Sequence, residues 1–338
     1  MAEGNQFAPI LVVGAGAVGG YIAAHLARAG ERIAVLEPWA PNREAIAAHG
    51  LTVEDPDETF TGRMPTMADA REVAALAPGL VILCTKLADA SQAVAAIEAV
   101  YRGPYLVTLN ALADQSVASQ TGVARVAGCI VTGLFGRLTA PGRLQRLRRR
   151  FDGGPATFLV GEATGPATPR IATLVAMLRQ VDRAEPVEDM AAARWTKLVF
   201  NAMTSPLSAL ESCPTRRLFT EPALRARLTA LALETVVVAQ AAGLSLGTIA
   251  GVPGPVWAAA ARGDVAARST LDAGLVGYGE KLSPDAISGM AQDRARGRRT
   301  EVTLINGLVV EEAGRRGLDA PANARVVAEL EAAMAATG

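Results

Sequence analysis

The sequence predicts an α/β fold in which a doubly wound parallel sheet is followed by an all-α C-terminal domain. Over the first half of the chain, short apolar runs typical of strands covered on both faces alternate with helical patterns. After about Glu185, long helical patterns dominate. At 338 residues the chain exceeds the size at which a single hydrophobic core usually stops growing, so we expect two domains. We place the boundary at Pro186, which gives domains of residues 1–186 and 187–338.

The N-terminal elements are predicted in the order strand, turn, helix, strand. They occupy residues 10–13, 14–20, 21–29 and 32–37, and Gly30 ends the helix. Buried strands at 80–84 and 105–109 follow helices over 69–76 and from about Asp89, and late strands near 129–135 and 156–161 complete or edge the sheet. In the second domain we expect helices over 187–210, 222–242 and 287–312 and from Pro321 onward.

The composition argues against several classes of protein. No apolar stretch approaches the roughly 18 residues of a membrane span. The first nine residues lack the basic start of a signal peptide, so we expect a soluble, cytoplasmic protein without a membrane partner. The formal net charge is zero, so no nucleic-acid partner is expected from the charge balance.

The cysteines and histidines do not form a metal-binding pattern. Cys84, Cys129 and Cys213 lie far apart and in odd number, which argues against a disulfide framework and against a zinc site. His25 and His49 stand in alanine-rich helical segments, where we expect them to face solvent. We therefore predict no metal.

The basic residues are distributed unevenly. Five arginines occur in the eight residues 143–150, which indicates a solvated strand or hairpin surface or, less simply, a phosphate-binding patch. Only three of the 33 basic residues are lysines, at positions 86, 197 and 281. In such a chain a lysine marks either a site that needs a compact, titratable ammonium or an exposed position where lysine persists by chance.

The turn after the first strand has the pattern Gly14-x-Gly16-x-x-Gly19 between an apolar strand and a helix. This context is typical of a Rossmann-type dinucleotide site, in which the glycines allow a tight turn, close approach to the pyrophosphate and close packing of helix on strand. The alternative is a glycine-rich connection without a ligand. The predicted cofactor contacts are Gly14, Ala15, Gly16, Ala17, Val18 and Gly19.

Glu37 ends the second strand, 23 residues after Gly14. A carboxylate there accepts hydrogen bonds from ribose hydroxyls and repels a 2′-phosphate, so NAD(H) is favoured. Arg43 lies near enough in sequence to reach a phosphate, which keeps NADP(H) as the alternative.

A second constellation occurs over residues 194–206. At helical spacing, Trp195, Leu198, Val199 and Ala202 should face the core. Lys197, Asn201 and Ser205, spaced by four residues, fall on another stripe. That stripe is either a line of catalytic groups or an ordinary polar helix face.

These motifs together resemble the ketopantoate reductase family of the 6-phosphogluconate-dehydrogenase-like superfamily. The resemblance covers the whole chain, and the matching segments are residues 14–19, 84–86, Asn110, 195–197 with Asn201, 292–293, 297–301 and 305–307. It implies a reductase that transfers hydride from a nicotinamide cofactor to the carbonyl of a 2-oxo acid in a cleft between the domains.

The resemblance also implies residue roles. Lys197 would be the general acid, Glu301 would bind a substrate hydroxyl, and Asn201 and Asn110 would orient substrate and lysine. Lys86 would lie along the cofactor, and Asn110 is also a predicted cofactor contact. A lysine suits the acid role because it both stabilises an alkoxide and can release a proton, whereas arginine cannot release one.

The chain departs from the family pattern at several positions. Ser205 stands where a second Asn is usual, and Gly289, with Ser288 adjacent, stands where a substrate-binding Ser is usual; we assign Ser205 and Ser288 to substrate binding in their place. The usual Asn-Gly is Asn110-Ala111, and Pro38 replaces the Arg that holds the 2′-phosphate of NADPH. The long connection 243–288, with Trp257, is expected to be either a lid or pocket wall or a plain surface insertion.

The activity that these features favour is reduction of 2-dehydropantoate, a step of pantothenate biosynthesis. Two alternatives are an NAD-dependent dehydrogenase that oxidises another hydroxy acid or a related alcohol or amine, and a catalytically silent dinucleotide-binding module. The apolar C-terminal helices favour a homodimer.

Overall fold

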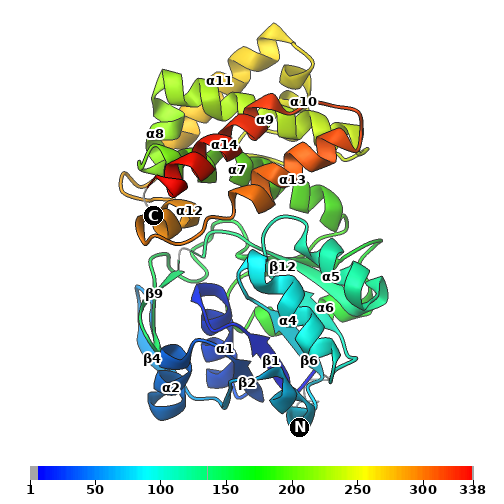
Figure 1. The fold of residues 1–338 in the computed structure, drawn as a ribbon, viewed down its shortest axis with the longest axis vertical. Helices are drawn as coiled ribbons and strands as arrows, with labels where there is room; N and C mark the ends of the chain where they lie inside the picture. The colour runs from blue at the N-terminus through cyan, green and yellow to red at the C-terminus, as the bar shows by residue number, and fades with distance from the viewer. Residues whose placement is uncertain (1–6, 135, 337–338) are drawn as a thin grey trace. The chain divides into compact units, whose positions relative to one another are not determined.

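The computed structural model describes residues 7–134 and 136–336, and the chain divides into two compact units between Met190 and Ala191. Unit 1 contains all the strands of the described residues, and unit 2 is built from helices (Figure 1). The division lies after the last strand, β12 (Ala184–Pro186), so Pro186 itself belongs to the sheet of unit 1. Within the described residues, no helix is both long enough and apolar enough to span a bilayer.

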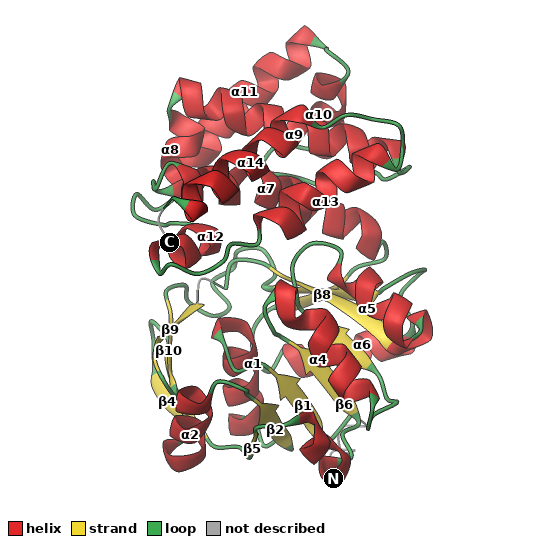
Figure 2. Ribbon diagram, in the orientation of Figure 1, coloured by secondary structure: helices red, strands yellow, loops and turns green. Residues whose placement is uncertain are grey.

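An eight-stranded sheet forms the centre of unit 1 (Figure 2). Its order is β12-β11-β8-β7-β6-β1-β2-β5, in which β8 through β5 are parallel and β11 runs antiparallel to β8. The bounds are β1 Ile10–Val13, β2 Ile33–Leu36, β5 Thr66–Met67, β6 Leu80–Leu83, β7 Tyr105–Val107, β8 Val126–Val131 and β11 Phe158–Glu162. The predicted late strands are therefore integral to the sheet. Phe135, in the predicted strand 129–135, lies outside the described residues.

Both faces of this sheet are covered, which explains the continuous apolar runs in its strands. In β1, Ile10 and Val12 pack in the core shared with α1 (Ala17–Arg28) and α6 (Pro169–Leu178), whereas Leu11 and Val13 pack with α4 (Ala90–Glu98) and α5 (Ala113–Thr121). All four β1 side chains are buried. Of the predicted helix over 69–76, Asp69 is the N-cap, Ala70–Glu72 is a 3₁₀ turn and Val73–Leu76 is α3.

A second, four-stranded sheet was not predicted. Its order is β4 (Thr59–Gly62), β3 (Leu51–Glu54), β10 (Arg143–Arg146), β9 (Gly136–Ala140), and α2 (Ala40–His49) precedes it. Leu51, Val53 and Leu144 from this sheet join the core around α1, so α1 is covered by strands on two sides. The pairing of β3 with β10 joins segments about 90 residues apart, and local patterns carry no signal for such a contact.

The arginine-rich segment 143–150 forms part of this second sheet and the loop after it. Arg143 and Arg149 are exposed and pair with Glu54 and Asp57, as a solvated hairpin predicts. That interpretation is wrong for Arg146, whose side chain is fully buried and donates to the Tyr21 hydroxyl at 2.7 Å and to Asp182 at 2.5 Å.

The Arg146 partner Asp182 is held in its charged form by its neighbours. Burial by itself would raise the pKa of Asp182, but hydrogen bonds from Thr157, the Phe151 N–H and Arg146 outweigh it and lower this pKa. The buried guanidinium therefore faces a carboxylate, which is the arrangement that a buried charge requires.

His25 is also buried, so the expectation that it faces solvent is wrong. The side chain is 1% exposed on α1, and its Nε2 lies 3.3 Å from Asp55 Oδ2, which also accepts from the Tyr21 hydroxyl at 3.1 Å. The second sheet covers this face of α1, and Phe60 of β4 contacts the ring edge on. Burial lowers the pKa of His25, an effect that the nearby Asp55 opposes and Arg150 and Arg28 reinforce. His49 is exposed, as predicted.

Unit 2 contains the helices α7 to α14 (Figure 1). Their bounds are α7 Met190–Leu210, α8 Thr215–Thr220, α9 Pro222–Ala241, α10 Gly254–Ala261, α11 Val265–Glu280, α12 Gly289–Ala295, α13 Val302–Gly314 and α14 Pro321–Ala335. The single helix predicted over 287–312 is wrong, because the chain breaks it into α12 and α13. Gly297, with a φ of 65°, lies in the break.

The connection 243–288 is not a plain surface insertion. It contains α10 and α11, which pack against α8 and α9. Trp257 is fully buried in the core of unit 2, and its indole N–H donates to the Ile249 carbonyl at 3.2 Å. The glycines and prolines before α10 form a turn at the surface of this core, in which Gly251 and Pro253 are exposed and Val252 is buried.

Replacement of His25 by Phe should remove a pH dependence of stability. Burial lowers the pKa of His25 in the folded protein, whereas in the unfolded chain this histidine titrates near 6.5. The unfolded chain therefore binds more protons as the pH falls below about 6.5, and acidification favours unfolding by up to about 1.4 kcal/mol per pH unit. Thermal unfolding between pH 5 and 8 measures this slope. His49→Gln, which alters the other histidine of the chain, should keep the wild-type slope; equal slopes for wild type and His25→Phe would contradict the assignment.

Candidate active site

The glycine turn lies at the carboxyl end of β1, where the strand order diverges toward β2 on one side and β6 on the other. This is the position at which doubly wound sheets bind ligands. Helix α1 begins at Ala17 with Gly16 as its N-cap, earlier than the predicted start at residue 21. Its first turn, including Val18 and Gly19, therefore presents unpaired backbone N–H groups beside the turn.

Each glycine of the turn meets a different steric requirement. Gly14 has a φ of 90°, and a Cβ there would lie 2.9 Å from the Cys84 carbonyl oxygen. A Cβ on Gly19 would lie 2.0 Å from the Gly14 carbonyl oxygen, so only glycine lets α1 approach the turn this closely. A Cβ on Gly16 would meet nothing within 4 Å. Gly14 and Gly19 thus serve the fold, whereas Gly16 faces open space that a ligand can occupy.

A further polar group next to the turn supports a ligand there. The Thr85 hydroxyl, which follows β6, is shielded from solvent and has no hydrogen-bond partner among the described residues. Its Cα is 3.3 Å from the Cβ that Gly14 would carry. Buried polar groups are rarely left unpaired, so the residues present fit a polar group such as a dinucleotide diphosphate.

Lys86 and Asn110 follow neighbouring parallel strands, β6 and β7, and so lie at the same sheet edge as the glycine turn. Lys86 is exposed and Asn110 is half-buried. Ala111, which replaces the glycine of the family pattern, adopts a φ of 56°. This left-handed conformation explains the glycine usual there, and alanine adopts it at a cost of about 1–2 kcal/mol.

Glu37, at the tip of β2, is 7% exposed, and its carboxylate contacts the glycine turn. Its Oε2 accepts the Ala15 N–H at 3.0 Å and the Asn42 amide at 3.1 Å, and its Oε1 accepts the Trp39 N–H at 2.9 Å. Asn42 also donates to the Ala15 carbonyl and accepts from the Gly142 N–H of the second sheet. The local sequence pattern gives no signal for the role of Asn42, because two of its three partners lie 27 and 100 residues away.

Arg43 lies beside the same strand tip. Its guanidinium donates to the Glu37 and Pro38 carbonyls, both at 3.2 Å, and its Nη2 lies 3.8 Å from the Glu44 carboxylate. These contacts hold the Arg43 guanidinium against the backbone of residues 37 and 38. In the family pattern an arginine stands at the position that Pro38 occupies here.

Cys84 is excluded as a nucleophile. Burial raises the pKa of its thiol to about 12, and the Thr108 hydroxyl donates to its sulfur at 3.2 Å. The thiol is therefore protonated at neutral pH and serves packing against Gly19.

In unit 2, α7 presents the predicted stripes. Trp195, Leu198, Val199 and Ala202 are at most 2% exposed, which confirms the expected core face. Lys197, Asn201 and Ser205 are all half-buried on another stripe of the same helix. One helix therefore offers an ammonium, an amide and a hydroxyl along one line.

Two further predicted site residues begin helices of unit 2. Glu301 is the N-cap of α13, and Ser288 is the N-cap of α12. The Ser288 hydroxyl accepts the Ala291 N–H at 3.1 Å and donates to the Ser205 carbonyl at 3.2 Å, which brings the start of α12 against α7. Because its proton is already donated to Ser205, a substrate contact by Ser288 would use a lone pair of its oxygen.

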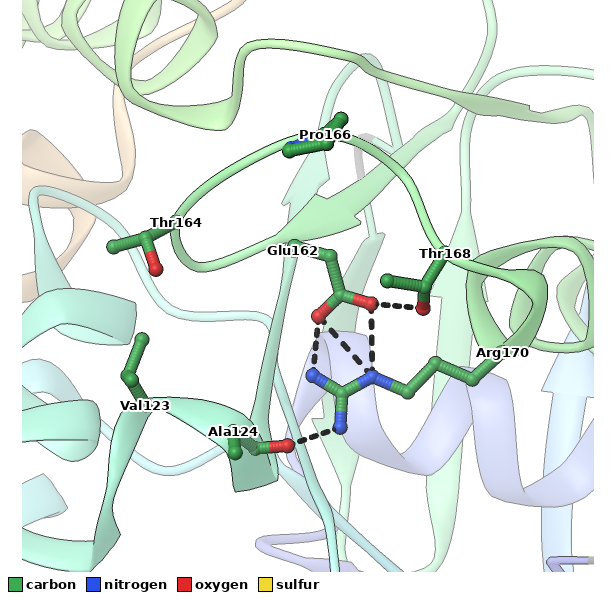
Figure 3. Close-up of a pocket in the computed structure, with 7 residues that line it drawn as sticks. All are labelled: Val123, Ala124, Glu162, Thr164, Pro166, Thr168 and Arg170. Carbon is green, nitrogen blue, oxygen red and sulfur yellow. Dashed lines mark hydrogen bonds and ion pairs between the residues drawn. The ribbon is translucent and has the colours of Figure 1, made fainter.

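A surface pocket of about 530 Å³ lies elsewhere in unit 1 (Figure 3). It adjoins the start of β8 and the end of the antiparallel β11, so it lies at the amino edge of the parallel strands, opposite the glycine turn. Arg170 in it pairs with Glu162 and donates to the Ala124 carbonyl. This pocket is therefore separate from the glycine turn of unit 1. Its lining residues are Val123, Ala124, Glu162, Thr164, Pro166, Thr168 and Arg170.

Alanine at positions 16 and 19 should have distinguishable effects. Gly16→Ala adds a methyl group in open space, so thermal stability should stay near wild type while dinucleotide affinity falls at least tenfold. Gly19→Ala forces the turn and α1 apart, and both stability and affinity should fall. Calorimetric titration with NADH and thermal unfolding measure the two effects. Unchanged affinity of a folded Gly16→Ala protein would show that the ligand does not use this space.

Comparisons with known proteins identify the family of the chain. The family model "Ketopantoate reductase PanE/ApbA" matches residues 10–157, and its C-terminal counterpart matches residues 189–334. The 2-dehydropantoate 2-reductases of Mesorhizobium japonicum and Caulobacter vibrioides are 28% and 27% identical to the chain, covering 90% and 96% of it and 91% and 98% of those proteins. The crystal structure of 2-dehydropantoate 2-reductase from Geobacter metallireducens GS-15 matches with a TM-score of 0.80 and 25% identity, over 96% of this chain and 99% of that one. The chain thus belongs to the ketopantoate reductase family, and it is an oxidoreductase that acts on a carbonyl group with a nicotinamide dinucleotide.

Proposed function

We propose that this protein reduces the carbonyl of 2-dehydropantoate, or of a closely related 2-oxo acid, with NADH as the hydride donor. The observation that carries the proposal is the stripe of Lys197, Asn201 and Ser205 on α7, in a chain where lysine is rare. The opposite face of this helix is buried, so its backbone is held in place by the core. The names of the relatives support the substrate class.

Lys197 is proposed to act on the carbonyl oxygen. When hydride from the bound dinucleotide reaches the carbonyl carbon, negative charge develops on oxygen. A positioned ammonium stabilises that charge and donates the proton that completes the alcohol, a contribution of about 10²–10⁴ in rate. Arginine at this position could supply only the charge.

Asn201 and Glu301 are proposed to orient the substrate. Asn201 lies one helical turn from Lys197 and offers both a donor and an acceptor. Glu301, at the start of α13, is a carboxylate and so accepts from a substrate hydroxyl. Ser205, Ser288 and Asn110 stay predicted substrate contacts, and the first two would replace the Asn and Ser of the family pattern.

The preference for NADH rests on the acceptor positions of Glu37. Its Oε2 already accepts two donors, whereas its Oε1 accepts one and retains one acceptor position. A ribose hydroxyl can donate to that position, but a 2′-phosphate offers no donor and adds like charge. Arg43, held against the strand-tip carbonyls, is the group that would favour NADPH instead.

Replacement of Lys197 by Ala should lower kcat by at least a hundredfold and leave the Kd for NADH within about twofold of wild type. The reason is that the ammonium acts on the substrate oxygen, while the dinucleotide turn belongs to unit 1. Lys281→Ala removes an exposed lysine of the same unit and should have normal kinetics. Near-normal turnover by Lys197→Ala would contradict the assigned role.

Steady-state reduction of 2-dehydropantoate should be more efficient with NADH than with NADPH. Glu37→Gln should reverse or narrow this preference, because glutamine loses the charge and one acceptor oxygen. Glu185→Gln, at an exposed carboxylate of β12 on the far side of the sheet from β2, serves as the matched control and should keep the wild-type ratio.

The same assay separates the alternative activities. Faster oxidation of another hydroxy acid with NAD would favour the dehydrogenase, and NADH binding without turnover of any carbonyl or alcohol substrate would favour the silent module. The predicted homodimer is tested by size-exclusion chromatography with light scattering, which measures the molar mass of the protein in solution.

A further inference from the structure

Helix α7 contains a proline in its interior, and a side chain from another helix replaces the hydrogen bond that this proline removes. Pro206 has no backbone N–H, so the carbonyl of Ala202, four residues earlier, lacks its helical donor. The Asn306 amide, from α13, donates to this carbonyl at 2.9 Å. Ala202 and Asn306 are both fully buried, so water cannot take over this role.

Asn306 is itself held by a chain of buried polar groups. Its other amide hydrogen is donated to Asn323 Oδ1, also at 2.9 Å. Asn323 donates to Glu234 Oε2 at 2.8 Å and to the Leu231 carbonyl at 3.2 Å, both on α9. The Glu234 carboxylate in turn accepts the N–H groups of residues 322 and 323, in the first turn of α14.

This arrangement fixes the orientation of the Asn306 amide. Both of its N–H hydrogens are used, whereas its carbonyl oxygen has no partner among the described residues. The position therefore requires a double donor, which among neutral side chains of this size means an amide.

The contact joins the two helices that carry the proposed catalytic groups. On α7, the accepting residue Ala202 is adjacent to Asn201 and five residues from Lys197. On α13, Asn306 lies five residues after Glu301, the N-cap of that helix. One hydrogen bond thus joins the helix that carries Lys197 and Asn201 to the helix that begins after Glu301.

We propose that Asn306 is a positioning residue of the reductase: it replaces the donor missing at Pro206 and thereby sets the geometry between α7 and Glu301. This inference rests on the proposed function for its kinetic consequence. Its structural part does not depend on the substrate: Asn306 donates to the Ala202 carbonyl because Pro206 cannot.

The test uses five variants of the full chain: Asn306→Ala, Pro206→Ala and their double variant, and Asn323→Ala with and without Pro206→Ala. Asn306→Ala leaves the Ala202 carbonyl without a donor, so Tm should fall by about 3–8 °C. Alanine at position 206 restores a backbone N–H in reach of the Ala202 carbonyl. The double variant should therefore regain at least half of the lost Tm, although each change alone alters a buried residue.

Asn323→Ala is the matched control. It removes a buried amide of the same polar chain, including the Oδ1 that accepts from Asn306, but keeps the Asn306 amide as a donor for the Ala202 carbonyl, so adding Pro206→Ala to it should give little or no recovery. If the Asn306→Ala protein does not fold, a folded Asn306→Ala/Pro206→Ala double variant counts as the same rescue. Absence of recovery in the double variant, or equal recovery in the Asn323 background, would overturn the proposal.

Kinetics distinguish positioning from bulk destabilisation. At a temperature where all variants are folded, Asn306→Ala should raise KM for the 2-oxo acid and lower kcat/KM about tenfold or more, with the Kd for NADH unchanged. The double variant should recover kcat/KM together with Tm. Recovery of Tm without recovery of kcat/KM would refute the positioning role. If no 2-oxo acid is turned over by wild type, the proposed function fails, while the Tm rescue still decides the pairing of positions 206 and 306.

Discussion

The close contact between α1 and the turn after β1 is the constraint on which the arrangement of unit 1 depends. Because Gly19 has no Cβ, the helix lies directly against the Gly14 carbonyl, and its N-terminal N–H groups are presented at the carboxyl edge of the sheet. The same placement puts Tyr21 and His25 under the second sheet, where Asp55 and Arg146 meet them. The glycine that lets α1 pack against the turn thus also determines where a buried polar cluster forms.

Polar groups at the turn have structural partners as well as proposed ligand contacts. Glu37 holds the Ala15 and Trp39 N–H groups and the Asn42 amide, so the turn is rigid before any dinucleotide binds. Such preorganisation reduces the entropy that binding must overcome. The proposed preference for NADH depends on the one acceptor position of Glu37 that these contacts leave open.

Unit 2 applies the same principle to a helix. Pro206 would leave a buried carbonyl unpaired in the middle of α7, and the amide of Asn306 satisfies it from α13. Since unpaired buried backbone groups are rare, the proline and the asparagine form one structural feature although they are 100 residues apart. The half-buried stripe of Lys197, Asn201 and Ser205 lies on the helix that this feature holds.

Sequence patterns alone were sufficient for the parallel strands, the glycine turn, the core face of α7 and the family, because each depends on residues within a few positions of one another or on ordered motifs. They were insufficient for the second sheet, the burial of His25 and Arg146, the break between α12 and α13, and the core position of Trp257. The roles of Asn42 and Asn306 also appeared only when distant segments came together, since a polar side chain in a helix has the same local signal whether it faces water or a carbonyl 100 residues away. Hydrophobic periodicity depends on neighbouring residues and can be read from the sequence. The partner of a buried polar group depends on which distant segments the tertiary structure brings together.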